Sequence, residues 1–399
     1  MPNVKNYINN TRQLQITLLC AFGLLMPFSR VVNLNMILIV LLVLLAIPQG
    51  IHVKKQQASP IQKTLFSLFI FFGIILVAIL YTENTKKGFQ ILTRSLPILL
   101  IPLSVLFIKG FSKKEIQQIL KYYIIGCVLS ILYCFILAAL NYSEDPLPLT
   151  QGFTYFTLPL DFHPSYLAMY SVFAFCAFIT IFDWKASKKR WIPYASWFLL
   201  LLFLLFLKSR APLLTLMSVT FLMLIKNVDR KIAILITVPI VASILFFASD
   251  LLELLSQGRN ITLTLADRLD IWTSAMDIIQ ENSIVGVGTG DYQIELDKQY
   301  YTTGFDKGID QKFNCHNQFL QTVVSYGLIG FLSLGAILFF IFKKGLQTKS
   351  FLPYYFLTCV GILMFFDSIL ILQHGVYFFS FFAAILLKLN YDSHEKQLQ

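Results

Sequence analysis

Residues 313–321 read FNCHNQFLQ, which places His316 and Asn317 between a polar stretch and the beginning of an apolar one. The pattern predicts a helix that starts close to His316. The positive end of a helix disfavours an imidazolium, so the ring is favoured in its neutral form, able to accept a proton. His316 is therefore the predicted general base, with Asn317 orienting either the histidine or an acceptor molecule.

Two positively charged segments precede this histidine. Lys208 and Arg210 stand in KSRAPL, at the start of an apolar run, where cations oppose the helix dipole. Their position indicates an anionic partner; the alternative is that both side chains reach up to lipid phosphates. Arg268 lies further along, near the start of a second predicted helix.

That second helix has a clear start signal. Thr264-Leu265-Ala266-Asp267 has the spacing of a capping box, and an apolar stripe at 3-4-3 spacing follows it. The stripe consists of Leu269, Trp272, Met276 and Ile279. We expect the helix to end near Asn282.

The sequence GVGTGDY follows, with Gly286 and Gly288 among its glycines. Glycines permit tight turns, and a run of exposed backbone N–H groups can bind an anion. A plain turn between helices explains the same spacing. No strand precedes the glycines, which excludes a dinucleotide-binding fingerprint.

Three other polar sites are candidates for a secondary role or a rival one. His163 and His374 begin apolar runs at the same predicted level as His316, and a structural role is the simpler interpretation of each. Asp367 ends an apolar run, where a carboxylate facing lipid is costly, so it is expected to face a polar cavity or the interface. Glu144-Asp145 is the alternative, a site for a divalent metal.

The composition defines the surroundings of these residues. Of the 399 residues, 57% are hydrophobic and 13% are charged, more apolar surface than one soluble core can bury. We predict an all-α membrane protein with about 12 transmembrane helices and one large helical periplasmic loop between spans 9 and 10. The predicted spans are 14–29, 34–51, 65–81, 89–108, 121–140, 164–182, 191–207, 211–226, 231–249, 318–342, 351–367 and 373–388.

The cationic connectors all fall on one side of this arrangement, and that side is taken as the cytoplasm, with both termini there. Lys86 and Lys87 are a local exception on the outer side. The chain then divides into spans 1–9 (1–249), the large loop (250–317), and spans 10–12 with a cytoplasmic tail (318–399). The net charge of +11 is spread over many small loops, which argues against a nucleic-acid partner.

Three segments in this order resemble one known family. They are SRAPL, then ADRLDIWTSAMDIIQENSIVGVGTGDY, then HNQFLQTVVSYGLIG. Their order, their spacing and the side of the membrane predicted for them resemble the O-antigen ligase and polymerase superfamily of bacterial membrane proteins. The resemblance covers roughly residues 205–345. Arg268 with Trp272, Gly286 with Gly288, and His316-Asn317 through Gly327 and Gly330 match the family pattern.

The resemblance implies a metal-independent, inverting glycosyltransferase of the bacterial inner membrane, with its active site on the periplasmic side and no cofactor. Its donor would be a glycan on undecaprenyl pyrophosphate, and its acceptor a hydroxyl of a glycolipid, such as lipid A-core, or of another glycan. His316 would be the base, and Arg268 and Arg210 would stabilise the departing pyrophosphate. The residues expected to contact substrate are Lys208, Asn317, Trp272, Gly286, Gly288, His163 and His374.

One departure and three alternatives accompany this prediction. Members of the family often carry an acidic residue where this chain has Ser325-Tyr326. A repeat-unit polymerase and a protein O-oligosaccharyltransferase of the same superfamily use the same chemistry. A transporter or lipid flippase is the alternative of another class, although no internal repeat is visible and the ionisable residues gather at the outer face.

Overall fold

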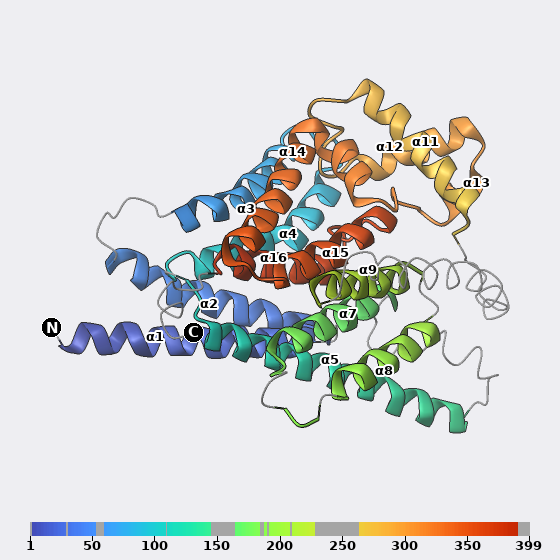
Figure 1. Cartoon of the computed structure of the whole chain (residues 1–399). Helices are drawn as coiled ribbons and strands as arrows, with labels where there is room; N and C mark the ends of the chain where they lie inside the picture. Colours follow the sequence, from blue (N-terminus) through green and yellow to red (C-terminus); the bar gives the residue numbers. More distant parts are fainter. Residues whose placement is uncertain are drawn as a thin grey trace.

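The structure is a computed structural model that describes residues 2–28, 31–52, 60–108, 110–144, 164–183, 187–189, 191–207, 210–227 and 263–389. These residues are predominantly α-helical (Figure 1). The helices are α1 (Pro2–Leu25), α2 (Val32–His52), α3 (Pro60–Val77), α4 (Thr85–Val105), α5 (Lys113–Glu144), α7 (Pro164–Ile181), α8 (Ile192–Phe206), α9 (Arg210–Asn227), α11 (Leu265–Glu281), α12 (Tyr292–Thr303), α13 (Asp306–Asp310), α14 (Gln318–Thr348), α15 (Leu352–Phe366) and α16 (Gln373–Leu387).

The predicted spans coincide with or overlap these helices, except the ninth (231–249), which lies outside the described residues. By length and hydropathy, four of the described helices are long and apolar enough to cross a membrane: Thr85–Val105, Lys113–Leu137, Pro164–Ile181 and Gln318–Thr348. Other apolar helices are shorter. The chain is thus an all-helical membrane protein, while a total of twelve spans stays a prediction.

The outer surface of the bundle agrees with a lipid environment. Large apolar side chains are exposed along several helices, among them Ile37 on α2, Ile136 on α5 and Leu199 on α8. Soluble monomers rarely expose contiguous apolar surface on this scale. In a bilayer the same side chains contact lipid tails.

The helices pack in two groups around one apolar core (Figure 1). One group contains α1, α5, α7 and α8, and the other contains α3, α4, α14 and α16. Aromatic rings fill the contact between α7, α15 and α16, where Phe173 lies 4.6 Å from Phe382 and 5.7 Å from Phe356, centroid to centroid. Such pairs add stability beyond their buried area.

α14 is broken near its beginning. Gly327 has φ +63° and ψ −165°, which interrupts an otherwise continuous helix. A Cβ at this position would lie 2.1 Å from the carbonyl oxygen of Ile284, so only glycine fits. The break separates the short segment after His316 from the long membrane helix that follows.

Helices α11, α12 and α13 form a separate polar layer at one end of the bundle (Figure 1). They have their own apolar cluster, which includes Ile271 of α11, Leu296 and Tyr300 of α12, and Cys315. Ile91 of α4 belongs to the same cluster. The layer is therefore packed onto the membrane bundle through α4 and α14.

The opposite end of the bundle is held by two buried or half-buried cations. The guanidinium of Arg12 forms a fork with Glu115, at 2.8 and 2.9 Å, and donates to the carbonyl of Gly110 at 2.8 Å. Lys388 donates to the carbonyls of Leu106 and Ile108. Together they satisfy carbonyl groups of the connector between α4 and α5.

Candidate active site

The predicted start of α11 is confirmed. The hydroxyl of Thr264 accepts a hydrogen bond from the backbone of Asp267, and the Asp267 carboxylate accepts one from the backbone of Thr264. Lys307 of α13 adds an ion pair to Asp267 at 2.7 Å. The helix that carries Arg268 ends at Glu281, with Asn282 as its C-cap, which is close to the expected end.

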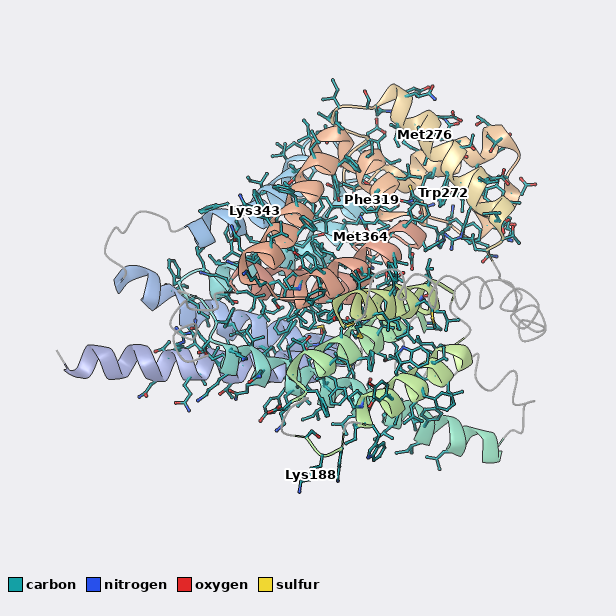
Figure 2. All side chains as sticks on the ribbon, in the orientation of Figure 1. Lys188, Trp272, Met276, Phe319, Lys343 and Met364 are labelled. Atoms are coloured by element: carbon teal, nitrogen blue, oxygen red, sulfur yellow. The ribbon has the colours of Figure 1, made fainter. Side chains whose placement is uncertain are left out.

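Only part of the predicted apolar stripe of α11 packs against the protein. Leu269 and Met276 are exposed, and Trp272 and Ile279 are only partly buried. The buried side consists of Ile271, Ser274, Ala275 and Ile278. Figure 2 shows Trp272 and Met276 on this helix at the polar end of the molecule.

Arg268 joins two segments that are far apart in the chain. Its Nη1 donates to the carbonyl of Phe366 at 2.8 Å and to the carbonyl of His316 at 3.3 Å. Its guanidinium carbon lies 5.7 Å from the centroid of the Phe366 ring. The side chain therefore brings the end of α15 next to the predicted base.

Trp272, one turn along α11, holds the same loop from beside Arg268. Its indole N–H donates to the carbonyl of Cys315 at 3.2 Å, and its ring packs edge-on against Phe365 at 5.7 Å. Trp272 thus contacts the residue before His316 and the residue before Phe366. Trp272 is therefore a positioning residue, which holds the loop before His316 against the end of α15.

His316 directly precedes the cap of α14 and has a left-handed backbone, with φ +41°. This conformation costs a non-glycine residue about 1 kcal/mol or more, and it is held by a 2.8 Å hydrogen bond from the His316 N–H to the side chain of Asn314. Nδ1 of the ring lies 3.7 Å from Oδ1 of Asp367, which caps the end of α15. The imidazole is 24% exposed, so a substrate can reach it.

The pairing of His316 with Asp367 is a feature that sequence reasoning missed. An acidic residue at the end of an apolar span was the available signal, but its partner lies on another helix. The separation of 3.7 Å is too long for a hydrogen bond and short enough for a direct charge interaction. Catalytic contacts of free enzymes are often long and shorten when substrate binds.

Asn317 has a structural role that differs from the prediction. Its Oδ1 accepts hydrogen bonds from the backbones of Phe319 and Leu320, at 2.9 and 3.1 Å, so it is the N-cap of α14. Asn317 is also buried. Its side-chain oxygen is occupied by this cap, so it positions the backbone that carries His316 and does not orient the imidazole ring through that atom.

The glycine turn is docked against other backbone and offers no cluster of free N–H groups. Gly286 donates to the carbonyl of Asn282, and Gly288 donates to that of Ser325, both at 3.0 Å. Val287 donates to Val324 in the same way. The anion-binding interpretation of Gly286 and Gly288 is corrected, because tertiary contacts take up these donors.

His374 lies near the pair formed by His316 and Asp367. Its ring packs edge-on against Tyr166 at 6.4 Å, and its carbonyl accepts a hydrogen bond from Tyr170 at 2.7 Å. These contacts tie the start of α16 to α7. His374 is thus placed as a packing residue at the edge of the candidate site.

The remaining predicted residues lie outside what the structure describes. Lys208, His163 and Asp145 are outside the described residues, and for Arg210 and Glu144 only the backbone is described, at the first residue of α9 and the last of α5. Their predicted roles stay predictions. Within the described ranges, the structure groups no three His, Cys, Asp or Glu side chains in a way that could hold a metal ion.

These features define an α-helical membrane protein whose candidate site lies at one polar end of the bundle. Residues 194–335 match the family model described as O-antigen ligase. The predicted resemblance to the O-antigen ligase superfamily is therefore confirmed, and the matched range contains Arg268, Trp272 and His316. An uncharacterized protein of Haemophilus influenzae is 27% identical over 323 residues, covering 74% of this chain and 76% of that protein.

Proposed function

We propose that this protein is an O-antigen ligase-like glycosyltransferase that works at the outer face of the inner membrane. Its donor is a glycan on undecaprenyl pyrophosphate, and its acceptor is a hydroxyl group of a surface glycolipid such as lipid A-core. The observation that carries this proposal is the assembly of His316, Asp367 and Arg268 from three separate segments at one end of a membrane bundle.

The base of the reaction is His316. The acceptor hydroxyl transfers its proton to Nε2 while its oxygen forms a bond to C1 of the donor sugar. Asp367 faces Nδ1 and stabilises the imidazolium that results. Because the oxygen attacks C1 in one displacement, the configuration at C1 is inverted.

The leaving group is the lipid pyrophosphate, which gains negative charge as its bond to C1 breaks. A guanidinium is well suited to stabilise that charge without a metal. Arg268 donates to the carbonyls of Phe366 and His316, and these contacts hold its guanidinium beside the proposed base. Arg210 and Lys208 are proposed to contribute from the start of α9.

A gel of surface glycans tests the ligase assignment against the polymerase alternative. Loss of the gene is expected to leave long glycan chains that are not attached to the acceptor lipid. Expression of the parent protein should restore attachment, and expression of His316→Ala should not. An accumulation of single repeat units would instead indicate a polymerase, and an unchanged glycan profile would contradict both.

A further inference from the structure

The outer half of α4 carries three cations that the proposed reaction does not use. Lys87 and Arg94 are seven residues apart, so they lie on the same side of the helix, and Lys86 directly precedes Lys87. We call these three residues the α4 basic stripe. Lys86 is exposed, and Lys87 and Arg94 are partly buried. In the predicted orientation the stripe faces outward, where lysine and arginine are least expected.

The stripe differs from the neighbouring cations of the polar layer. Lys298, Lys307 and Lys312 each form an ion pair with a carboxylate, at 2.6 to 2.7 Å. In the part of the chain that the structure describes, no ion pair within 4.0 Å involves a residue of the stripe. Glu83 and the carboxylate of Asp291 lie at the same end of α4, but neither forms an ion pair with the three cations. The stripe is therefore a candidate site for an anionic ligand.

The level of Arg94 is defined by the packing of α4. Ile91, one turn earlier, belongs to the apolar cluster of the polar layer together with Ile271 and Tyr292. Gly290 approaches the same helix so closely that its Cβ would lie 2.3 Å from the carbonyl oxygen of Asn84. The first turns of α4 are thus covered by the polar layer, and Arg94 follows directly after them.

The stripe also adjoins the candidate active site. Ile91 and Ser95 of α4 line a small cavity together with Gln318, Gln321 and Ser325 of α14. These α14 residues belong to the short segment that begins directly after His316 and Asn317. The helix that carries the stripe therefore packs against the segment that follows His316.

The charge of Arg94 acts on a residue of this region. Burial raises the pKa of Tyr292 to about 12, a nearby Cys315 adds to the shift, and the positive charge of Arg94 opposes it. Arg94 is therefore close enough to the polar layer to interact with the Tyr292 hydroxyl.

We propose that the α4 basic stripe binds the phosphate groups of the acceptor's lipid headgroup. This inference rests on the proposed function, because it assumes that the acceptor is a phosphorylated glycolipid. A phosphate monoester carries up to two negative charges and three acceptor oxygens, which suit two ammonium groups and a guanidinium fork. The donor pyrophosphate is assigned to Arg268, on α11.

The test measures binding and does not depend on transfer. The full-length protein in nanodiscs is titrated with a glycolipid that carries phosphate monoesters, with the same glycolipid after enzymatic dephosphorylation, and with phosphatidylglycerol. The stripe variant combines Lys86→Gln, Lys87→Gln and Arg94→Gln.

The matched control variant combines Lys113→Gln, Lys114→Gln and Lys121→Gln. These three lysines are exposed on α5, and their loss removes the same net charge. Folding of both variants is compared with the parent by thermal unfolding. His316→Ala is included because it removes the proposed base and leaves the stripe intact.

We expect the parent, the α5 variant and His316→Ala to bind the phosphorylated glycolipid at least about tenfold more tightly than the dephosphorylated form. The folded stripe variant should lose this difference. Equal discrimination by the stripe variant, or equally tight binding of phosphatidylglycerol by the parent, would overturn the proposal. A parent that never transfers glycan but shows the expected binding would refute the proposed function and leave the stripe as a site for phosphorylated glycolipid.

Discussion

The two ends of the bundle use the same kind of side chain in different ways. At the end where α4 and α16 finish, the guanidinium of Arg12 forms a fork with the carboxylate of Glu115 and is neutralised by it. At the polar end, Arg268 donates to the carbonyls of His316 and Phe366, which position the guanidinium but carry no net charge. The Arg12 fork stabilises the fold, whereas Arg268 is the arginine that we propose binds the donor.

The largest effect is expected at Asp367, because its carboxylate faces the imidazole of His316. Replacement of Asp367 by Asn keeps the size of the side chain and removes the charge that faces His316. We expect the rate of glycan transfer to fall about a hundredfold, with donor affinity unchanged. Single-turnover kinetics and a separate donor-binding titration measure the two quantities, and an unaltered rate would show that Asp367 does not act on His316.

The glycine turn provides a test of how the polar end is positioned. Gly286 and Gly304 have nearly the same φ, +72° and +70°, but a Cβ at Gly286 would lie 2.5 Å from the backbone of Ser325 and Tyr326, and a Cβ at Gly304 would meet nothing within 4 Å. Gly286→Ala should therefore lower the free energy of unfolding by about 2 kcal/mol more than Gly304→Ala. Thermal unfolding compares the two, and equal losses would mean that the close docking is not needed for stability.

Substitution of each arginine by lysine tests whether Arg268 and Arg12 have different roles. Arg268→Lys should weaken binding of the lipid-pyrophosphate donor about tenfold, because an ammonium cannot make the same fork to phosphate. Arg12→Lys should leave donor affinity unchanged and lower stability by about 1 kcal/mol, through loss of the fork to Glu115. If both variants bound the donor like the parent, Arg268 would be a structural arginine too.

The smallest effect concerns pH and the start of α11. Burial of Asp267 would raise its pKa, but hydrogen bonds from Lys307 and from the backbone and hydroxyl of Thr264 outweigh burial and hold the pKa below its ordinary value. A carboxylate with a depressed pKa contributes stability above its unfolded value, about 3.9, and that stability is lost as pH falls through the folded value.

Hydrogen exchange of α11 amides, corrected for intrinsic rates, should therefore show less protection at about pH 3 than at about pH 6. Asp267→Asn serves as the control and should show little difference between the two conditions. Equal protection of the parent at both values would contradict the role of this carboxylate.

Local rules predicted much of the fold and part of the site. The capping box at Thr264 and Asp267 and the end at Asn282 depend on neighbouring residues, so the sequence was sufficient for them. The contact of His316 with Asp367 joins distant segments and depends on how α14 and α15 pack. The use of the Gly286 and Gly288 donors also depends on tertiary docking, which spacing alone does not reveal.

The break at Gly327 is a further example. Apolar residues continue on both sides of it, so the sequence predicts one uninterrupted helix. The left-handed backbone is required only because the turn at Ile284 approaches this position. The backbone conformation of Gly327 therefore depends on a tertiary contact and not on the local sequence pattern.

Glycan transfer in proteoliposomes tests whether the protein is a metal-independent glycosyltransferase that uses His316 and Arg268. The purified parent, His316→Ala and Arg268→Ala are supplied with an undecaprenyl-pyrophosphate oligosaccharide and a glycolipid acceptor, with EDTA present throughout. We predict that the parent transfers the glycan with inversion at C1, and that both folded variants transfer it at least a hundredfold more slowly, a loss of about 2.7 kcal/mol of transition-state stabilisation. Transfer by His316→Ala at the parent's rate, or a requirement for a divalent metal, would contradict the account.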